Sequence, residues 1–192
     1  MLITFYSISS IFSDFIKNPD VDIIPEDEIQ KLVYSLIKIN KTLWDLEDSA
    51  RLSELGERYV ANVKKNIDVY NQQRNDLIRE IDTGLHKFLN VSRGAKESFY
   101  SESPGMIIDR LSIIFIKLSV VQKIIAVVEE DDLRLEYLEK EKILTGQIEN
   151  IGNFFDLYIE RLLKKDVFFE IQQPVKIYND ARVRKYIKYF IR

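Results

Sequence analysis

The chain has 192 residues, of which 46% are hydrophobic and 31% are charged, and its formal net charge is −3. This length fits one domain with a sizeable core, and the composition is that of a globular protein rather than of a disordered one. The acidic balance argues against a protein that coats nucleic acid. The absence of cysteine excludes a disulfide framework and a thiolate nucleophile, and the scarcity of glycine and proline favours long helices.

The first predicted element is a short helix over residues 2–16, which the prolines of the segment NPDVDIIP end. The N-terminus lacks the positive leader and the cleavage site of a signal peptide. A second helix is predicted to begin at residue 27. Its stripe of alternating four- and three-residue steps is mostly apolar, but two of its positions are Asn40 and Glu47. Two polar side chains therefore stand where core residues are expected.

The third predicted helix runs from Ser53 or Glu54 to about Leu89, and it carries Arg74 on its apolar stripe. Burying an unpaired guanidinium costs several kcal/mol, so an anion is expected to meet it. The candidates are Asp109 from the next helix, Asp76 nearby, or a bound ligand. Both a structural ion pair and a ligand clamp fit this position.

A fourth helix, about 104–129, begins at Pro104 and is apolar on nearly every side, as expected of the central helix of a bundle. Its charged residues leave no apolar run near the roughly 20 residues that span a bilayer. A fifth helix, about 131–165, precedes an irregular segment and a short basic helix from about residue 180. We predict an all-α antiparallel bundle over residues 1–175, with residues 176–192 as a C-terminal tail docked on it.

Four polar clusters interrupt the apolar pattern, in NKTLWDLEDSAR, NQQRNDLIREID, SESPGMIIDR and PVKIYNDAR. Two arginines, Arg74 and Arg110, and the free N–H groups of a helix start suit an anion. Both arginines are expected to be largely buried and to contact a carboxylate or amide side chain. The candidate ligand-binding residues are Asn40, Trp44, Glu47, Asn71, Arg74, Asn75, Ser103, Gly105, Asp109, Arg110, Lys176 and Tyr178. Structural explanations compete with this one, because Trp44 also fits a core position and the single histidine, His86, has no local catalytic partners.

A metal site is the alternative. Glu47, Asp48, Asp76 and Glu80 are carboxylates on predicted helices, and all-α nucleotide hydrolases hold Mg²⁺ with such side chains. Their spacing does not match a paired acidic motif, and a ladder of polar residues on a long helix usually faces solvent. A metal-dependent phosphoester or nucleotide hydrolase therefore ranks second.

The motifs LWDLEDSAR, NQQRNDLIREID, SESPGMIIDRLSI and KIYND occur in this order, and together they resemble a bacterial family catalogued as domain of unknown function 4254. The resemblance covers most of residues 40–180. In that family a Ser-Glu-Thr-Pro-Gly sequence begins a helix, and Ser103 stands here in place of the threonine. Histidine often follows the tryptophan of the family, whereas this chain has Asp45. The resemblance implies no established activity, but it implies bacterial origin and genes near those for lipopolysaccharide and surface-glycan assembly.

We therefore expect a cytoplasmic, non-catalytic binding or accessory protein with a polar pocket for a phosphorylated or acidic sugar-type ligand in surface-glycan assembly. The expected partners are that anionic small molecule or a glycan-assembly protein, with no cofactor, no nucleic acid and no transmembrane segment. Residues 176–192 carry six basic side chains against one acid. Docking of this tail on the bundle, or on a second copy in a homo-oligomer, is favoured over a membrane surface. Lys176 or Tyr178 is expected to complete the pocket.

Overall fold

The structure is a computed structural model that describes residues 3–19, 21, 25, 27–92 and 98–173, together with residues 182, 183, 186 and 189 of the tail. Five α-helices make up most of this described part, which confirms the predicted all-α bundle. They are α1 (Phe5–Lys17), α2 (Glu28–Ala50), α3 (Glu57–Phe88), α4 (Pro104–Val127) and α5 (Asp131–Leu163). A short 3-10 helix, η1 (Ser53–Leu55), precedes α3, and the strands β1 (Ser98–Phe99) and β2 (Val167–Phe168) pair in parallel.

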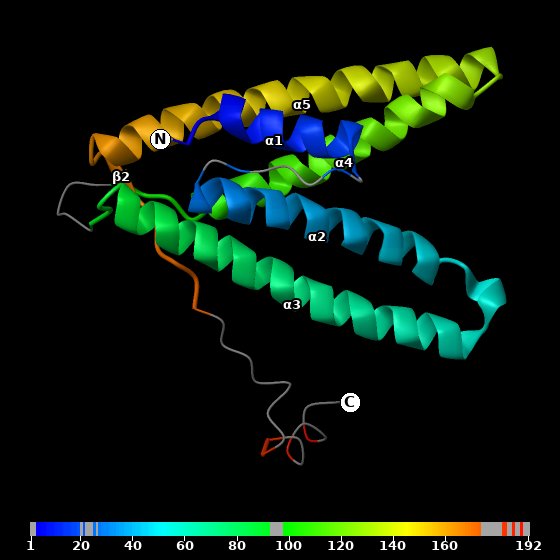
Figure 1. The fold of residues 1–192 in the computed structure, drawn as a ribbon, viewed down its shortest axis with the longest axis horizontal. Helices are drawn as coiled ribbons and strands as arrows, with labels where there is room; N and C mark the ends of the chain where they lie inside the picture. Colours follow the sequence, from blue (N-terminus) through cyan, green and yellow to red (C-terminus); the bar gives the residue numbers. More distant parts are fainter. Residues whose placement is uncertain are drawn as a thin grey trace.

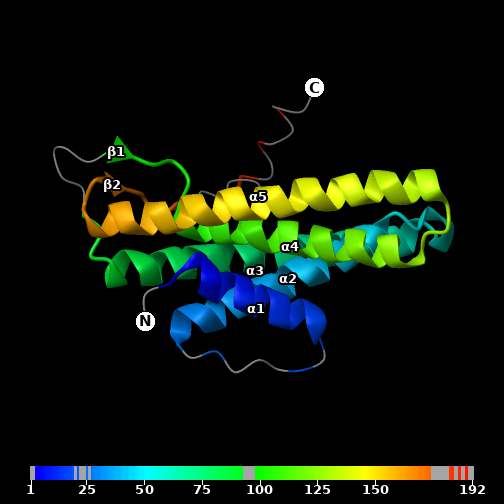
Figure 2. The same cartoon turned by 90° about the horizontal axis from the view of Figure 1, so that it is seen from above.

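Two antiparallel hairpins organise the molecule. Helices α2 and α3 form one hairpin and α4 and α5 form the other, while α1 packs against α2, α4 and α5 (Figure 1). The hairpins lie together at the end that carries β1 and β2 (Figures 1 and 2), and they diverge toward their α2–α3 and α4–α5 turns (Figure 1). The core therefore lies toward the strand end, where all five helices meet.

Local sequence explains where the helices begin. The side chains of Thr4, Asp27 and Ser103 each accept a hydrogen bond from a backbone N–H in the first turn of α1, α2 and α4. The predicted start of the third helix at residue 53 or 54 is wrong, because Gly56 has a φ of 89° and separates η1 from α3. Glycine adopts this left-handed region without steric cost, so the chain turns there before the long helix starts.

The first half of α4 is central, as predicted. Ile107, Ile108 and Leu111 are at most 1% exposed, and the helix contacts α1, α2, α3 and α5. Its second half differs, because Val121 and Ile125 are only half-buried and Val127 is 77% exposed. The end of α4 is less buried than its beginning because it lies beyond the point where the two hairpins diverge.

The segment after α5, predicted to be extended or irregular, begins with the short strand β2. Ser98 and Tyr100 donate backbone hydrogen bonds to Asp166 and Phe168, which forms the small parallel sheet, and Val167 and Phe169 are buried. The predicted boundary at residues 175 and 176 and most of the predicted terminal helix lie outside the described residues. Among the helices of the described part, none is both long and apolar enough to cross a bilayer.

Candidate functional site

Arg74 forms a two-pronged ion pair with Asp109, the partner that the sequence offered from the central helix. Its Nε and Nη2 donate to the two carboxylate oxygens of Asp109 over 2.8 and 2.6 Å. Asn40 of α2 donates through Nδ2 to Asp109 Oδ1 over 2.8 Å and to Ser112 Oγ over 2.6 Å. Three helices therefore meet in one polar network, which explains why Asn40 and Arg74 occupy apolar stripes.

The network fixes the orientation of the Arg74 guanidinium. The Asp109 and Asn40 side chains are buried, whereas 30% of the Arg74 side chain is exposed. Within the described residues, the Nη1 group of Arg74 has no hydrogen-bond acceptor, so its donors remain for another molecule. A guanidinium held in this way needs little reorganisation to bind an anion with its open edge.

A second polar set joins α3 to the start of α4. The hydroxyl of Ser103 donates to Asp82 Oδ2 over 2.5 Å, and the backbone N–H of Gly105 donates to Asp82 Oδ1 over 2.7 Å. Burial raises the pKa of Asp82 to about 6, although the bonds from Ser103 and Gly105 act in the opposite direction. In the part of the chain that the structure describes, no cation pairs with this carboxylate.

The start of α4 is thus occupied by the protein's own anion. Helix N-termini attract negative charge, and Asp82 supplies it at the place where the sequence suggested a ligand. A side chain at Gly105 would lie 2.7 Å from both Asp82 Oδ1 and the carbonyl oxygen of Ile78, so the close approach of α3 to α4 requires glycine. Ser103 and Gly105 position Asp82 and join α3 to α4, and the N–H of Gly105 is not free for a ligand.

Two neighbouring cavities collect most of the predicted ligand-binding residues. The larger, about 540 Å³, is lined by Arg74, Asn75, Ile78, Arg79, Asp82, Glu102, Ser103, Met106, Asp109, Arg110, Ile113, Gln172 and Gln173. The smaller, about 260 Å³, is lined by Asn40, Leu43, Trp44, Glu47, Asp48, Arg51, Asn71, Arg74, Ile113 and Ile116. Arg74 and Ile113 belong to both linings, so the guanidinium lies where the two cavities meet.

The charges of the larger cavity are balanced. Arg79 pairs with Asp76 over 2.7 Å, and Arg110 pairs with Glu102. The expectation that Arg110 would be buried is wrong, because 55% of its side chain is exposed; its expected contact with a carboxylate is confirmed. An exposed ion pair of this kind contributes little to the free energy of folding. The Arg110 side chain can therefore leave Glu102 and contact a ligand with little loss of stability.

The carboxylates proposed for a metal are not gathered in one place. Asp48 pairs with Arg51 and Asp76 with Arg79, while Glu47 and Glu80 are exposed. Across the described ranges, no group of three or more acidic or histidine side chains is close enough to hold a metal ion. Lys176 and Tyr178, which were expected to complete the pocket, lie outside the residues that the structure describes.

Sequence reasoning missed several lining residues. Asp82 is not among the predicted ligand-binding residues, although it follows Ile78 by one helical turn. It is buried because Gly105 brings α4 against the face of α3 that carries Asp82. Glu102 stands beside the predicted Ser103, but it lies eight residues before Arg110, which is not a helical pairing distance, so the sequence did not indicate their contact. Gln172 and Gln173 carry no signal in the sequence, because they reach the cavity only after the chain returns through β2.

Comparison with known proteins gives the family of the chain and nothing more specific. No curated protein and no solved structure matches it. The matched family covers residues 30–170, a range that includes α2 to β2 and nearly all the residues that line the two cavities. The resemblance noted from the four motifs is therefore confirmed, and the chain belongs to the family described as "Protein of unknown function (DUF4254)".

Proposed function

We propose that the protein is a non-catalytic binding or accessory protein whose two cavities hold a phosphorylated or acidic sugar-type ligand. The observation that carries the proposal is Arg74, which Asp109 orients from one side and which faces both cavities. Its open edge supplies paired donors for a phosphate or carboxylate. Arg110, whose pair with Glu102 is exposed, is the second candidate contact.

The smaller cavity has the side chains that a sugar ring needs. Trp44 offers an aromatic face, and Asn40, Asn71 and Glu47 carry amide and carboxylate groups that bond hydroxyls. A pocket of this kind fixes a ligand through an apolar wall and a few polar groups. In this proposal the anionic group lies beside Arg74 and Arg110, and the ring lies on the Trp44 side.

The hydrolase alternative has less support. It requires carboxylates that converge on a metal, whereas Asp48 and Asp76 are engaged by arginines and Glu47 and Glu80 lie exposed. Melting curves with and without Mg²⁺, together with an assay for hydrolysis of nucleotide sugars to a nucleoside monophosphate and a sugar 1-phosphate, separate the two functions. We expect neither a Mg²⁺-dependent rise in melting temperature nor hydrolysis.

Calorimetry tests the binding function. The surface-glycan setting implied by the family resemblance suggests the probes, which are a sugar 1-phosphate, a nucleoside diphosphate sugar and a uronic acid. We expect at least one probe to bind, and Arg74→Lys to weaken it by about tenfold or more, because lysine keeps the charge but loses the forked donors. Arg110→Gln should weaken the same probe.

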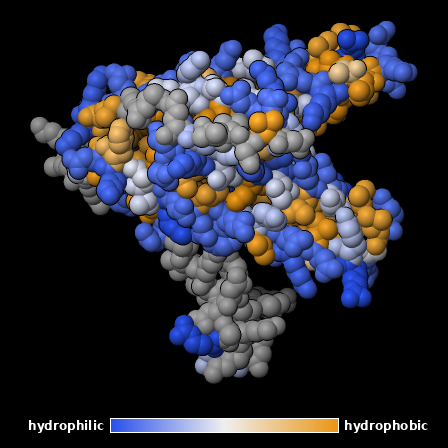
Figure 3. Space-filling view, in the orientation of Figure 1, coloured by the Kyte–Doolittle hydropathy of each residue, from blue (hydrophilic) through white to orange (hydrophobic). Residues whose placement is uncertain are grey.

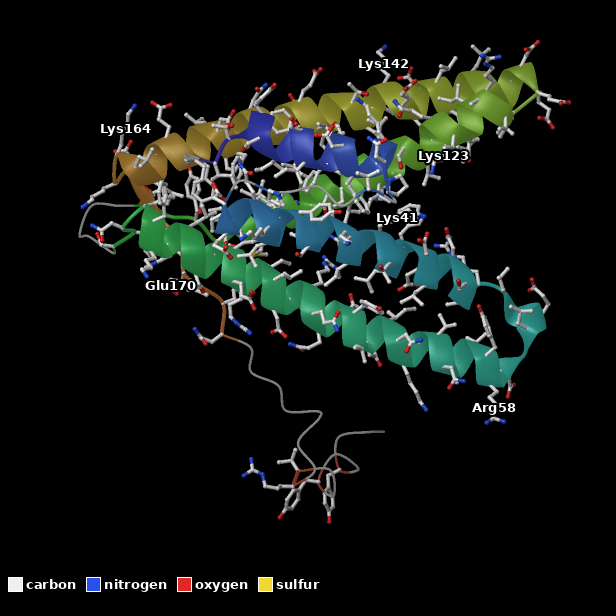
Figure 4. The ribbon with its side chains drawn as sticks, viewed as in Figure 1. Lys41, Arg58, Lys123, Lys142, Lys164 and Glu170 are labelled. Carbon is white, nitrogen blue, oxygen red and sulfur yellow. The ribbon has the colours of Figure 1, made fainter. Side chains whose placement is uncertain are left out.

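Arg58 provides the matched control. It lies on the same helix about 24 Å before Arg74 and is exposed, and its side chain points away at the far end of α3 (Figure 4). Arg58→Gln should leave the affinity unchanged. Failure of the wild-type protein to bind any of the three probes, or equal affinity in Arg74→Lys, would overturn the proposal.

A further inference from the structure

The outer part of the α4–α5 hairpin carries apolar side chains that the rest of the described chain does not bury. We call residues 120–144 the α4–α5 arm, which comprises the end of α4, the connection and the beginning of α5. Every Val, Leu, Ile and Tyr in this arm is partly or fully exposed, with Val127 at 77%, Leu135 at 65% and Ile143 at 51%. Farther along α5, outside the arm, Phe155 is fully buried.

The arm stands apart from the α2–α3 hairpin. Figure 3 shows hydrophobic atoms gathered at the end of the arm and a hollow between the arm and the α2–α3 hairpin. An apolar groove of about 370 Å³ runs along it, lined chiefly by Val120, Val121, Ile124, Tyr137, Ile143 and Leu144, with Trp44 beside them. Two helices alone bury little of their own apolar surface, and exposed patches of this kind mark interaction surfaces.

We propose that the α4–α5 arm is a dimerisation surface and that its occupant is the same arm of a second copy of this chain. Two such hairpins packed against each other complete a four-helix arrangement, which buries apolar faces that a single hairpin leaves exposed. A two-fold dimer, in which one patch meets itself, is the commonest symmetric assembly.

The charges of the arm favour an antiparallel pairing of the two copies. Its tip, Glu129–Asp132, is acidic, whereas its base carries Lys123, Lys140 and Lys142 against Glu139 and Glu141. Antiparallel packing places each acidic tip beside the partner's base and keeps the two tips apart. Figure 4 shows Lys123 and Lys142 on opposite sides of the arm, so positive charge is available on both faces. The acidic tip also opposes binding to an anionic membrane.

The mass of the full chain in solution tests the proposal. Light scattering during gel filtration should give a mass near twice the monomer's 22.7 kDa at micromolar concentration. This outcome does not depend on the ligand, so it stands or falls separately from the proposed function. A monomer at every concentration up to about a millimolar would overturn the inference, because an interface of this size gives a much tighter dimer.

Charged substitutions locate the interface. Tyr137→Glu combined with Ile143→Glu should raise the dimer dissociation constant by about tenfold or more, because both side chains line the groove, are partly exposed in one copy and become buried in the pair. Leu157→Glu is the matched control, since it changes a 52% exposed leucine on the same helix outside the arm. Circular dichroism checks that all three proteins remain helical. A dimer unaffected by the double change, or equally weakened by the control, would overturn the assignment of the arm.

The absence of cysteine allows a second, independent test. Single cysteines introduced at positions 133, 137 or 143 can be treated with a short bifunctional maleimide, and Leu157→Cys is the control. At least one arm position should give a covalent dimer while position 157 gives none. Cross-linking at position 157 alone would place the contact elsewhere on α5 and contradict the proposal.

Discussion

Two buried carboxylates in the same region are stabilised in different ways. Asp109 is paired with the guanidinium of Arg74, whereas Asp82 has only the hydroxyl of Ser103 and the N–H of Gly105. Burial therefore raises the pKa of Asp82 to about 6 from its ordinary value of 3.8. The folded protein holds this proton more tightly than the unfolded chain does, which links stability to pH.

The Asp82 carboxyl should make the free energy of unfolding fall as the pH rises. Its stabilising contribution is complete below about pH 4 and is lost as the pH passes about 6, an effect of roughly 3 kcal/mol. Asp82→Asn removes this dependence, and it should be more stable than the wild type at pH 8 by about 1–3 kcal/mol. Urea unfolding at several pH values measures both.

Asp68→Asn serves as the comparison, because Asp68 is exposed on the same helix. Its pH profile should follow that of the wild type. Parallel profiles for Asp82→Asn and the wild type would mean that the buried carboxyl does not hold its proton more tightly in the folded state.

Asp82 should also affect the binding of anions in the larger cavity. A carboxylate in the lining opposes a negative ligand, so affinity should rise as Asp82 takes up a proton near pH 6. For a diphosphate diester, whose charge is constant over this range, we expect an increase of roughly tenfold between about pH 7.5 and 5.5. Calorimetry with Asp82→Asn should show a weaker dependence, and an equal dependence would contradict the role of Asp82.

The pair of Arg74 and Asp109 should be costly to break on one side. Arg74→Met leaves the buried carboxylate without its cation, and the free energy of unfolding should fall by about 3 kcal/mol. Adding Asp109→Asn should restore part of this loss, since the neutral amide no longer needs a cation. Arg79→Met, which breaks a pair at the helix surface, should cost less than about 1 kcal/mol. Equal losses at the two arginines, measured by urea unfolding, would contradict the buried role of Arg74.

At the scale of elements, helix contacts depend on positions where a side chain would not fit. Gly105 brings the start of α4 against α3, and Gly152 of α5 lies under the ring of Phe5, where an added carbon would be 2.5 Å from the ring. Gly146 of α5 has nothing within 4 Å of such a carbon. The same substitution should therefore have opposite effects at different glycines.

Gly105→Ala should destabilise the protein by about 1–3 kcal/mol, because the new methyl group meets Asp82 and the backbone of Ile78. Gly146→Ala should stabilise it by about 0.5–1 kcal/mol through helix propensity alone. Thermal and urea unfolding of the two variants give the comparison. Tolerance of alanine at position 105 would show that α3 and α4 are not held this closely.

At the scale of the whole molecule, the two hairpins share a core at one end and diverge at the other. The stability of the backbone should follow this division, since local opening is easiest where few apolar contacts are buried. In the Tyr137→Glu and Ile143→Glu variant, studied at a concentration where it is a monomer, amides of residues 120–144 should exchange roughly a hundredfold faster than those of residues 148–162. Hydrogen exchange with mass spectrometry measures this, and uniform protection along α5 would contradict it.

The sequence by itself determined the all-α class and the order of the helices, because helical periodicity and capping residues act over a few neighbouring positions. It also marked Asn40 and Arg74 as anomalies on apolar stripes and supplied Asp109 as a partner, since a buried guanidinium needs an anion. Gly56 escaped the prediction, because a single backbone conformation decides where α3 begins.

Which polar residues meet depends on how the helices pack against one another. Asp82 accepts a hydrogen bond at the N-terminus of α4 because Gly105 allows α3 and α4 to approach closely. The residue pattern of each helix does not indicate how close the two helices lie. The exposure of Arg110 and of the α4–α5 arm likewise depends on where the hairpins diverge, whereas apolar periodicity marks only which side chains would be buried if a neighbour were present. Burial is a property of the whole arrangement of helices, and for that reason a single chain's pattern could not assign it.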